Sequence, residues 1–215
     1  MKNIKLLLAL LALLALLALV ALTACNNAPQ QPQQTTQYEN PTIATIMERR
    51  SIRAYKPDTI ARQTLERIIE CGINAPNGQN KQSWEIRIVH NPAIFDSLKT
   101  IMADAYPDKA EMAVGSFRGA PVMIFIARDL NYDFSAYDCG LLAQNIMLSA
   151  QSLGIGSICL GSPVRFINDN PACAPILQRL NFSPNYQLSL CIGLGYANET
   201  PDPKPRNKAK AQFLE

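Results

Sequence analysis

This sequence has a single histidine, no CxxC cysteine pair and no strong net charge. His90 is the single histidine among 215 residues, and the six cysteines include no CxxC pair. Cys25 stands in the N-terminal region and leaves five others, an odd number. These counts argue against a zinc site and against a complete disulfide framework.

The net charge of the chain is small. The chain carries 20 Lys and Arg against 17 Asp and Glu, a formal net charge of +3, and loss of Lys2 and Lys5 with a leader would lower it by two, to +1. Net charge therefore gives no reason to expect a nucleic-acid partner. The dinucleotide-binding turn G-x-G-x-x-G is absent too, which argues against FAD in that setting.

The cysteines and the histidine are expected to be structural. Four cysteines lie among apolar residues and are interpreted as small core residues: Cys71, Cys139, Cys159 and Cys191. Cys173 lies in a proline-rich turn and is expected to be the more exposed thiol. His90 follows a predicted strand and precedes Asn91-Pro92, so we expect it at the surface.

The N-terminal residues contain the parts of a secretory signal. Two lysines precede an unbroken run of Leu, Ala and Val over residues 6–22, and small residues lead to Cys25. A run of about 17 apolar residues is also the lower limit for a membrane-spanning helix, so an uncleaved anchor is the alternative. Leu22-Thr23-Ala24-Cys25 resembles the bacterial lipobox, which implies cleavage before Cys25 and lipidation of its thiol.

We therefore predict a signal peptide over residues 1–24 and attachment to a membrane through lipid on Cys25. The location would be the bacterial cell envelope, periplasmic or associated with the outer membrane. Residues 25–40 are rich in Gln, Pro and Thr, which predicts a flexible tether. Residues 41–215 have the length of one compact domain with one core.

The stretch 137–163 is the centre of that domain. Apolar residues surround most of a helix over residues 138–153, which indicates burial on nearly every side. Gly154 suits the helix end, and a short strand over residues 155–160 leads to Gly161 and Ser162. Where a buried helix leads into a strand that ends in glycine, backbone N–H groups are exposed and a flat ligand can approach them closely. The alternative interpretation is a core helix and a core strand without a ligand.

The other elements follow from periodicity and turn signals. Further helices are expected over residues 41–49, 62–73 and 92–105, with short helical segments over 163–180. Further strands are expected over residues 84–89, 121–127 and 186–194, and the weak pattern of residues 106–119 predicts a mobile flap. Helices and strands alternate without a strict βαβ rhythm, so the fold class is α+β.

Two basic clusters lie far apart in the chain. Arg49-Arg50-Ser51-Ile52-Arg53 follows the first helix, and the tail carries Lys204, Arg206, Lys208 and Lys210. Together they suit one dianion, because arginine and lysine provide bidentate geometry and charge. Taken separately, each cluster is more typical of a solvated basic turn or tail.

These motifs, in this order, resemble the nitroreductase family of FMN enzymes over residues 41–206. The resemblance rests on four stretches: residues 49–53, residues 75–84 (APNGQNKQSW), the helix with Gln144-Asn145 that leads to residues 153–157 (LGIGS), and residues 193–196 (GLGY) before Lys204-Pro205-Arg206. It implies an α+β fold with a central mixed or antiparallel sheet flanked by helices. It also implies an intertwined homodimer with FMN at the subunit interface.

The resemblance assigns cofactor-binding residues. The phosphate and ribityl chain would be held by Arg49, Arg50, Ser51, Lys204 and Arg206, with Arg53 near the pyrimidine edge of the flavin. The partner subunit's loop against the flavin would contain Pro76, Asn77 and Gly78, steadied by Asn80 and Gln82. Backbone amides of Cys159, Leu160 and Gly161 would face the ring near N5. No side chain need act as a nucleophile, because the cofactor carries the chemistry.

Two departures from the family pattern bear on function. Ser83-Trp84 stands where Pro-Trp is usual, and Gly161 stands where an acidic residue is common, which alters the wall beside the reactive nitrogen. We predict an FMN-dependent oxidoreductase with a small-molecule electron donor and small flat acceptors of nitroaromatic or quinone type, acting by a ping-pong mechanism. The alternatives are a flavin- or small-molecule-binding lipoprotein without turnover, and a specialised flavin reaction such as reductive dehalogenation or flavin destruction.

Overall fold

The computed structural model describes residues 38–214, of which Asn40 onward belongs to one compact unit, Asn40–Glu215. The predicted signal peptide (1–24), Cys25 and residues 26–37 of the predicted tether lie outside the described residues. Within residues 38–214, no helix is both long enough and apolar enough to cross a membrane.

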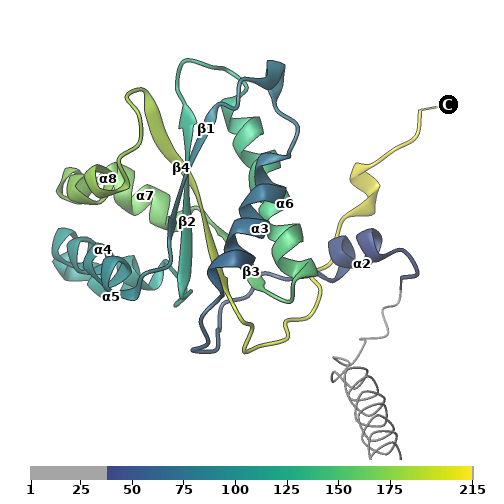
Figure 1. Cartoon of the computed structure of the whole chain (residues 1–215), viewed down its shortest axis with the longest axis horizontal. Coiled ribbons are helices and arrows are strands. Elements are labelled where there is room, and N and C mark those ends of the chain that lie inside the picture. Colours follow the sequence, from purple (N-terminus) through teal and green to yellow (C-terminus); the bar gives the residue numbers. More distant parts are fainter. Residues whose placement is uncertain (1–37, 215) are drawn as a thin grey trace, which may run out of the picture. The chain divides into compact units, whose positions relative to one another are not determined.

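The centre of the unit is a four-stranded antiparallel sheet in the order β1-β2-β4-β3 (Figure 1). The strands are β1 (Trp84–Val89), β2 (Val122–Asp129), β3 (Gly156–Leu160) and β4 (Tyr186–Gly195). β2 and β4 form the middle, so β1 and β3 are the two edges. The predicted α+β class and sheet are confirmed.

Helices cover both faces of this sheet (Figure 1). One face is covered by α3 (Arg62–Ile73) and α6 (Ser135–Ser152), and the other by α4 (Pro92–Ala105), α5 (Ala110–Gly115), α7 (Ser162–Asp169) and α8 (Ala174–Leu180). α2 (Pro41–Glu48) contacts α6. Short 3-10 turns complete the chain: η1 (Gly78–Asn80), η2 (Pro107–Lys109), η3 (Pro171–Cys173) and η4 (Lys208–Lys210).

The continuous apolar run of β2 follows from burial on both faces. Met123 and Phe125 belong to the core cluster beneath α4 and α8, whereas Ile124 and Ile126 belong to the cluster beneath α3 and α6. Side chains alternate across a strand, so each face needs an apolar residue at every second position. All four side chains are fully buried.

The central helix α6 begins at Ser135, three residues before the predicted start. Its residues Leu142, Ile146 and Ala150 are fully buried against the sheet and α3. Leu141 keeps 44% of its surface exposed, so the predicted burial on nearly every side is incomplete within one chain. Large apolar side chains of the neighbouring α2 are also exposed, among them Ile46 and Met47.

Three details differ from the sequence-based expectations. Residues 106–119 contain η2 and α5, and Phe117 is buried, so the segment is packed and not a loose flap. Cys159 is exposed, because it alternates with Ile158 and Leu160, which face the core. Cys173 is buried instead, because η3 packs against α4.

Candidate functional site

The cationic loop after α2 runs along the open edge of β3. Ser51 forms a parallel bridge with Ser157, and the Ile52 N–H donates to the Ser157 carbonyl at 3.0 Å. This pairing extends the sheet by one short segment beyond its edge strand. It fixes residues 49–53 beside β3, which ends at Leu160, directly before Gly161.

Two buried polar atoms on this edge lack a partner. Arg49 Nη1 and Ser157 Oγ have no hydrogen-bond partner among residues 38–214, although neither atom reaches the surface. Ile158 and Leu160 point into the core beneath α4, so Ser157 and Cys159 point to the opposite face. An unpaired buried donor costs free energy, which a bound anion at this place would recover.

Like charges surround the Arg49 guanidinium. Its burial, followed by the cations of Arg50 and Arg206, lowers the pKa of Arg49 from its ordinary value. Arg206 comes from the tail, so the fold brings the two basic clusters together, as predicted for one dianion. Lys204 is exposed beside Arg206, whose Nη1 donates to the Lys204 carbonyl at 3.1 Å.

The other two arginines of the loop are held by backbone carbonyls. Arg50 Nη1 donates to the Met47 carbonyl at 2.7 Å, where α2 ends. Arg53 Nη1 donates to the Ser51 carbonyl at 3.0 Å, and its side chain is exposed. The Glu199 carboxylate, which no sequence pattern indicated, accepts from the backbone N–H groups of Arg53 and Ala54 and so fixes the end of the loop.

The end of β3 is open on the side that the sequence predicts for the flavin. Leu160 is buried, whereas Gly161 is exposed and has no heavy atom within 4 Å of where a Cβ would stand. The Cys159 thiol beside it is exposed. Partial desolvation raises the pKa of this thiol, and Arg49 opposes that shift.

A buried carboxylate holds the loop before β1. Asp138, in the first turn of α6, is 2% exposed. Its Oδ1 accepts from the Gly78 N–H at 2.9 Å, and its Oδ2 accepts from the Ser83 hydroxyl at 2.6 Å. A side chain at Gly78 would collide with the Tyr132 hydroxyl. Asp138 was not among the predicted site residues, although an acidic residue in an apolar helix was a signal that the sequence offered.

The same loop has an unusual backbone. Gln79, Asn80 and Gln82 have φ of 53°, 54° and 48°, the left-handed region that costs non-glycine residues free energy. Asn77 Oδ1 accepts from the Gln82 N–H at 2.9 Å and closes the turn. The side chains of Asn80 and Gln82 are exposed. Pro76, the first residue of the loop assigned to the flavin, is exposed as well.

Within one chain, the two halves of the predicted site lie at opposite edges of the sheet. The loop with Gly78 precedes β1, and residues 49–53 lie beyond β3, with β2 and β4 between them. Three strand spacings separate β1 from β3, about 14 Å. One chain therefore brings Arg49 and Arg206 together but keeps Pro76, Asn77 and Gly78 apart from them.

Comparison with known proteins decides the family. The family model described as "Nitroreductase family" matches residues 46–196. The chain belongs to the nitroreductase family. A nitroreductase from Desulfitobacterium hafniense DCB-2, crystallised with bound FMN, superimposes with a TM-score of 0.73 at 30% identity, over 83% of this chain and 100% of that one. A second, with bound FMN, from Bacteroides fragilis NCTC 9343 gives 0.72 at 25% identity, over 82% and 100%.

Relatives in the family carry names of oxidoreductases. The NADPH-flavin oxidoreductase of Vibrio harveyi is 26% identical over 174 residues, 78% of this chain and 70% of that protein. The 4-nitrobenzoate reductase of Pseudomonas putida is 26% identical over 199 residues, 73% of this chain and 85% of that protein. The nitroreductase fold predicted from the sequence is confirmed, and these relatives agree with the predicted class of FMN-dependent oxidoreductase.

Proposed function

We propose that this chain is an FMN-dependent oxidoreductase that takes electrons from a small-molecule donor and passes them to a small flat acceptor of nitroaromatic or quinone type. The observation that carries the proposal is the pair of unpartnered buried atoms, Arg49 Nη1 and Ser157 Oγ, beside the second cation Arg206. Such a group of donors is incomplete without an anion.

The residues present fit FMN. Arg49, Arg206 and Lys204 would hold the terminal phosphate, and the Ser51 and Ser157 segment would hold the ribityl chain. Gly161 would leave room for the ring at the end of β3, since no atom fills the space beside it. When bound, FMN supplies reversible two-electron chemistry. Arg53 would stabilise negative charge on the pyrimidine edge of the reduced ring, once freed from the Ser51 carbonyl.

A homodimer would complete the site. In one chain the loop held by Asp138 lies at the edge opposite Arg49, so we propose that it covers the flavin of the partner subunit. Exposed apolar side chains support this arrangement: Met47 of α2 and Leu141 of α6 retain 50% and 44% of their surface. Their burial against a second copy would contribute about 25 cal/mol per Å² of apolar area.

Membrane attachment through Cys25 is a separate proposal. It rests on the sequence Leu22-Thr23-Ala24-Cys25 behind an apolar leader. Replacement Cys25→Ser should move the protein from the membrane fraction to the soluble fraction, and an unchanged distribution would contradict lipid anchoring.

The relative from Vibrio harveyi is named for NADPH. A donor outside the cytoplasmic membrane would have to be a different reductant.

The test of function begins with the purified protein. We expect a flavin absorbance spectrum, and heat release followed by chromatography should identify FMN. Dithionite should bleach the spectrum, and a benzoquinone added anaerobically should restore it, as the quinone takes up two electrons and two protons to become a hydroquinone. If the protein binds flavin but neither quinone nor nitroaromatic acceptors reoxidise the reduced flavin, the result would support the alternative of a flavin-binding protein without turnover. A protein that cannot be loaded with FMN would overturn the proposal.

A further inference from the structure

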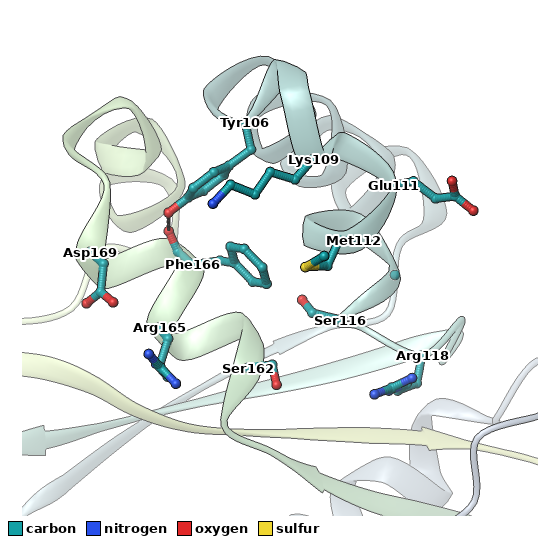
Figure 2. Close-up of a pocket in the computed structure, with 11 residues that line it drawn as sticks. Tyr106, Lys109, Glu111, Met112, Ser116, Arg118, Ser162, Arg165, Phe166 and Asp169 are labelled. Carbon is teal, nitrogen blue, oxygen red and sulfur yellow. Dashed lines mark hydrogen bonds between the residues drawn. The ribbon is translucent and has the colours of Figure 1, made fainter.

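A cavity of about 820 Å³ lies between α5 and α7 (Figure 2). Its size is that of a small-molecule site. The residues that define its character are Lys109, Met112, Arg118, Ser162, Arg165 and Phe166. None of them belongs to the cofactor-binding residues described above.

Three cations line this cavity. Lys109, Arg118 and Arg165 take part in no salt bridge or side-chain hydrogen bond with residues 38–214. The acidic residues in the lining are Glu111 and Asp169. Figure 2 shows the Glu111 carboxylate pointing away from the other side chains, with Arg118 and Arg165 on either side of Ser162. Three cations then line the cavity with one carboxylate, Asp169, so the net charge of the lining is positive, which favours an anionic ligand.

Flat and polarisable groups line another part of the wall. The Phe166 ring and the Met112 thioether lie close to each other between Lys109 and Ser162 in Figure 2. Tyr106 packs edge-on against Phe166, with 5.0 Å between ring centroids, and its hydroxyl donates to the Phe166 carbonyl at 2.8 Å. These contacts fix the aromatic wall, which suits a planar apolar ring.

One lining residue of the cavity adjoins the end of β3, where the flavin is predicted. Ser162 opens α7 directly after Gly161, the open end of β3. A ligand at the Ser162 end of the cavity would therefore lie next to the position that the proposed function gives to the ring, beside Gly161.

We propose that this cavity binds the electron acceptor as an aromatic anion, a planar ring that carries a carboxylate, with Arg165 and Arg118 as the residues that recognise the charge. The inference rests on the proposed function and narrows its acceptor class. For a nitroaromatic acceptor, the reaction is a two-electron reduction of the nitro group. The nitro group accepts two electrons from the reduced enzyme and two protons from enzyme and solvent, loses one oxygen as water and becomes a nitroso group.

The experiment compares an acid with its uncharged isostere. FMN-loaded protein is reduced with stoichiometric dithionite and mixed anaerobically with 4-nitrobenzoate or 4-nitrobenzamide, and flavin reoxidation is followed by stopped flow. We expect the acid to be preferred at least about tenfold in apparent affinity. In Arg165→Gln and Arg118→Gln this discrimination should fall toward unity. Arg67→Gln, an exposed arginine on α3, is the matched control and should keep it.

Binding without turnover gives an independent measurement. Calorimetric titration of the oxidised protein should show benzoate binding more tightly than benzamide, and the difference should vanish in Arg165→Gln. Equal affinity for acid and amide in the unmodified protein, or discrimination unchanged in both arginine variants, would overturn the inference. Inorganic phosphate that competes as well as benzoate would overturn the requirement for an aromatic ring.

These results separate the inference from the proposed function. Reoxidation by 4-nitrobenzamide without any advantage for the acid refutes the anion site alone. Arginine-dependent binding of benzoate without reoxidation by any acceptor refutes the proposed function and leaves the cavity as an aromatic-anion site.

Discussion

Removal of the Asp138 carboxylate should loosen the loop before β1 and destabilise the protein. Asp138 is 2% exposed and accepts two hydrogen bonds, from the Gly78 N–H and the Ser83 hydroxyl. Hydrogen bonds to a charged group contribute roughly 1.5 to 3 kcal/mol each. Asp138→Ala should therefore lower the free energy of unfolding by about 3 to 6 kcal/mol. Asp138→Asn keeps an acceptor for Gly78 and should cost about half as much.

Urea unfolding at fixed protein concentration measures this loss. Asp104→Ala, an exposed acid on α4, is the control and should change the free energy of unfolding by less than about 0.5 kcal/mol. A double-mutant cycle with Ser83→Ala isolates the shared bond, because residues in contact give non-additive effects. Trypsin gives a local readout, since the exposed Lys81 lies in this loop and should be cleaved faster in Asp138→Ala.

Two results would refute this reasoning. One is a loss of less than about 1 kcal/mol for Asp138→Ala, which would show that the carboxylate is not desolvated. The other is strict additivity with Ser83→Ala. If stability falls but cleavage at Lys81 does not accelerate, then Asp138 supports the helix and not the loop.

Three further predictions concern the cofactor and assembly. Arg49→Gln should weaken FMN binding roughly tenfold to a hundredfold, measured by fluorescence titration. Arg53→Ala should retain FMN and lower the midpoint potential of the flavin. If both variants lose FMN equally, Arg49 and Arg53 do not have separate roles in binding and in redox tuning. Cys159 should react with a thiol reagent faster as pH rises, because the thiolate is the reactive form, and this rise should come at higher pH than for an ordinary thiol, because the pKa of Cys159 is raised. FMN should protect Cys159, and labelling indifferent to FMN would place the cofactor elsewhere. Light scattering of a form without residues 1–25 should give twice the monomer mass, and a flavin-loaded monomer would contradict the shared site.

Local patterns were sufficient for most of the fold. Asn91 caps α4 through its side chain, and Pro92 follows it, so the start of this 14-residue helix was readable from the sequence. The helix over residues 62–73 and the strand over residues 84–89 also have their predicted bounds. In each case neighbours within a few positions determine the element.

Burial of single side chains was less predictable. Cys159 and Cys173 exchanged their expected environments, because apolar neighbours in sequence do not say which face of an edge strand is covered. Residues 106–119 offered only scattered apolar positions, yet α5 packs against α4 and α7. Such burial depends on elements far along the chain.

The hydrogen-bond partners of the site residues were even less predictable from the sequence than burial was. The sequence places arginines in one loop but does not say which of them has a partner. In the structure, the Arg50 guanidinium donates to the Met47 carbonyl, three positions away, and the Arg53 guanidinium donates to the Ser51 carbonyl, two positions away. The backbone N–H of Arg53 donates to Glu199, which is 146 positions away. Only Arg49 keeps a buried nitrogen without a partner among the arginines of the described residues. A missing partner is a property of the folded chain, and on this ground we propose that the cofactor phosphate binds at Arg49.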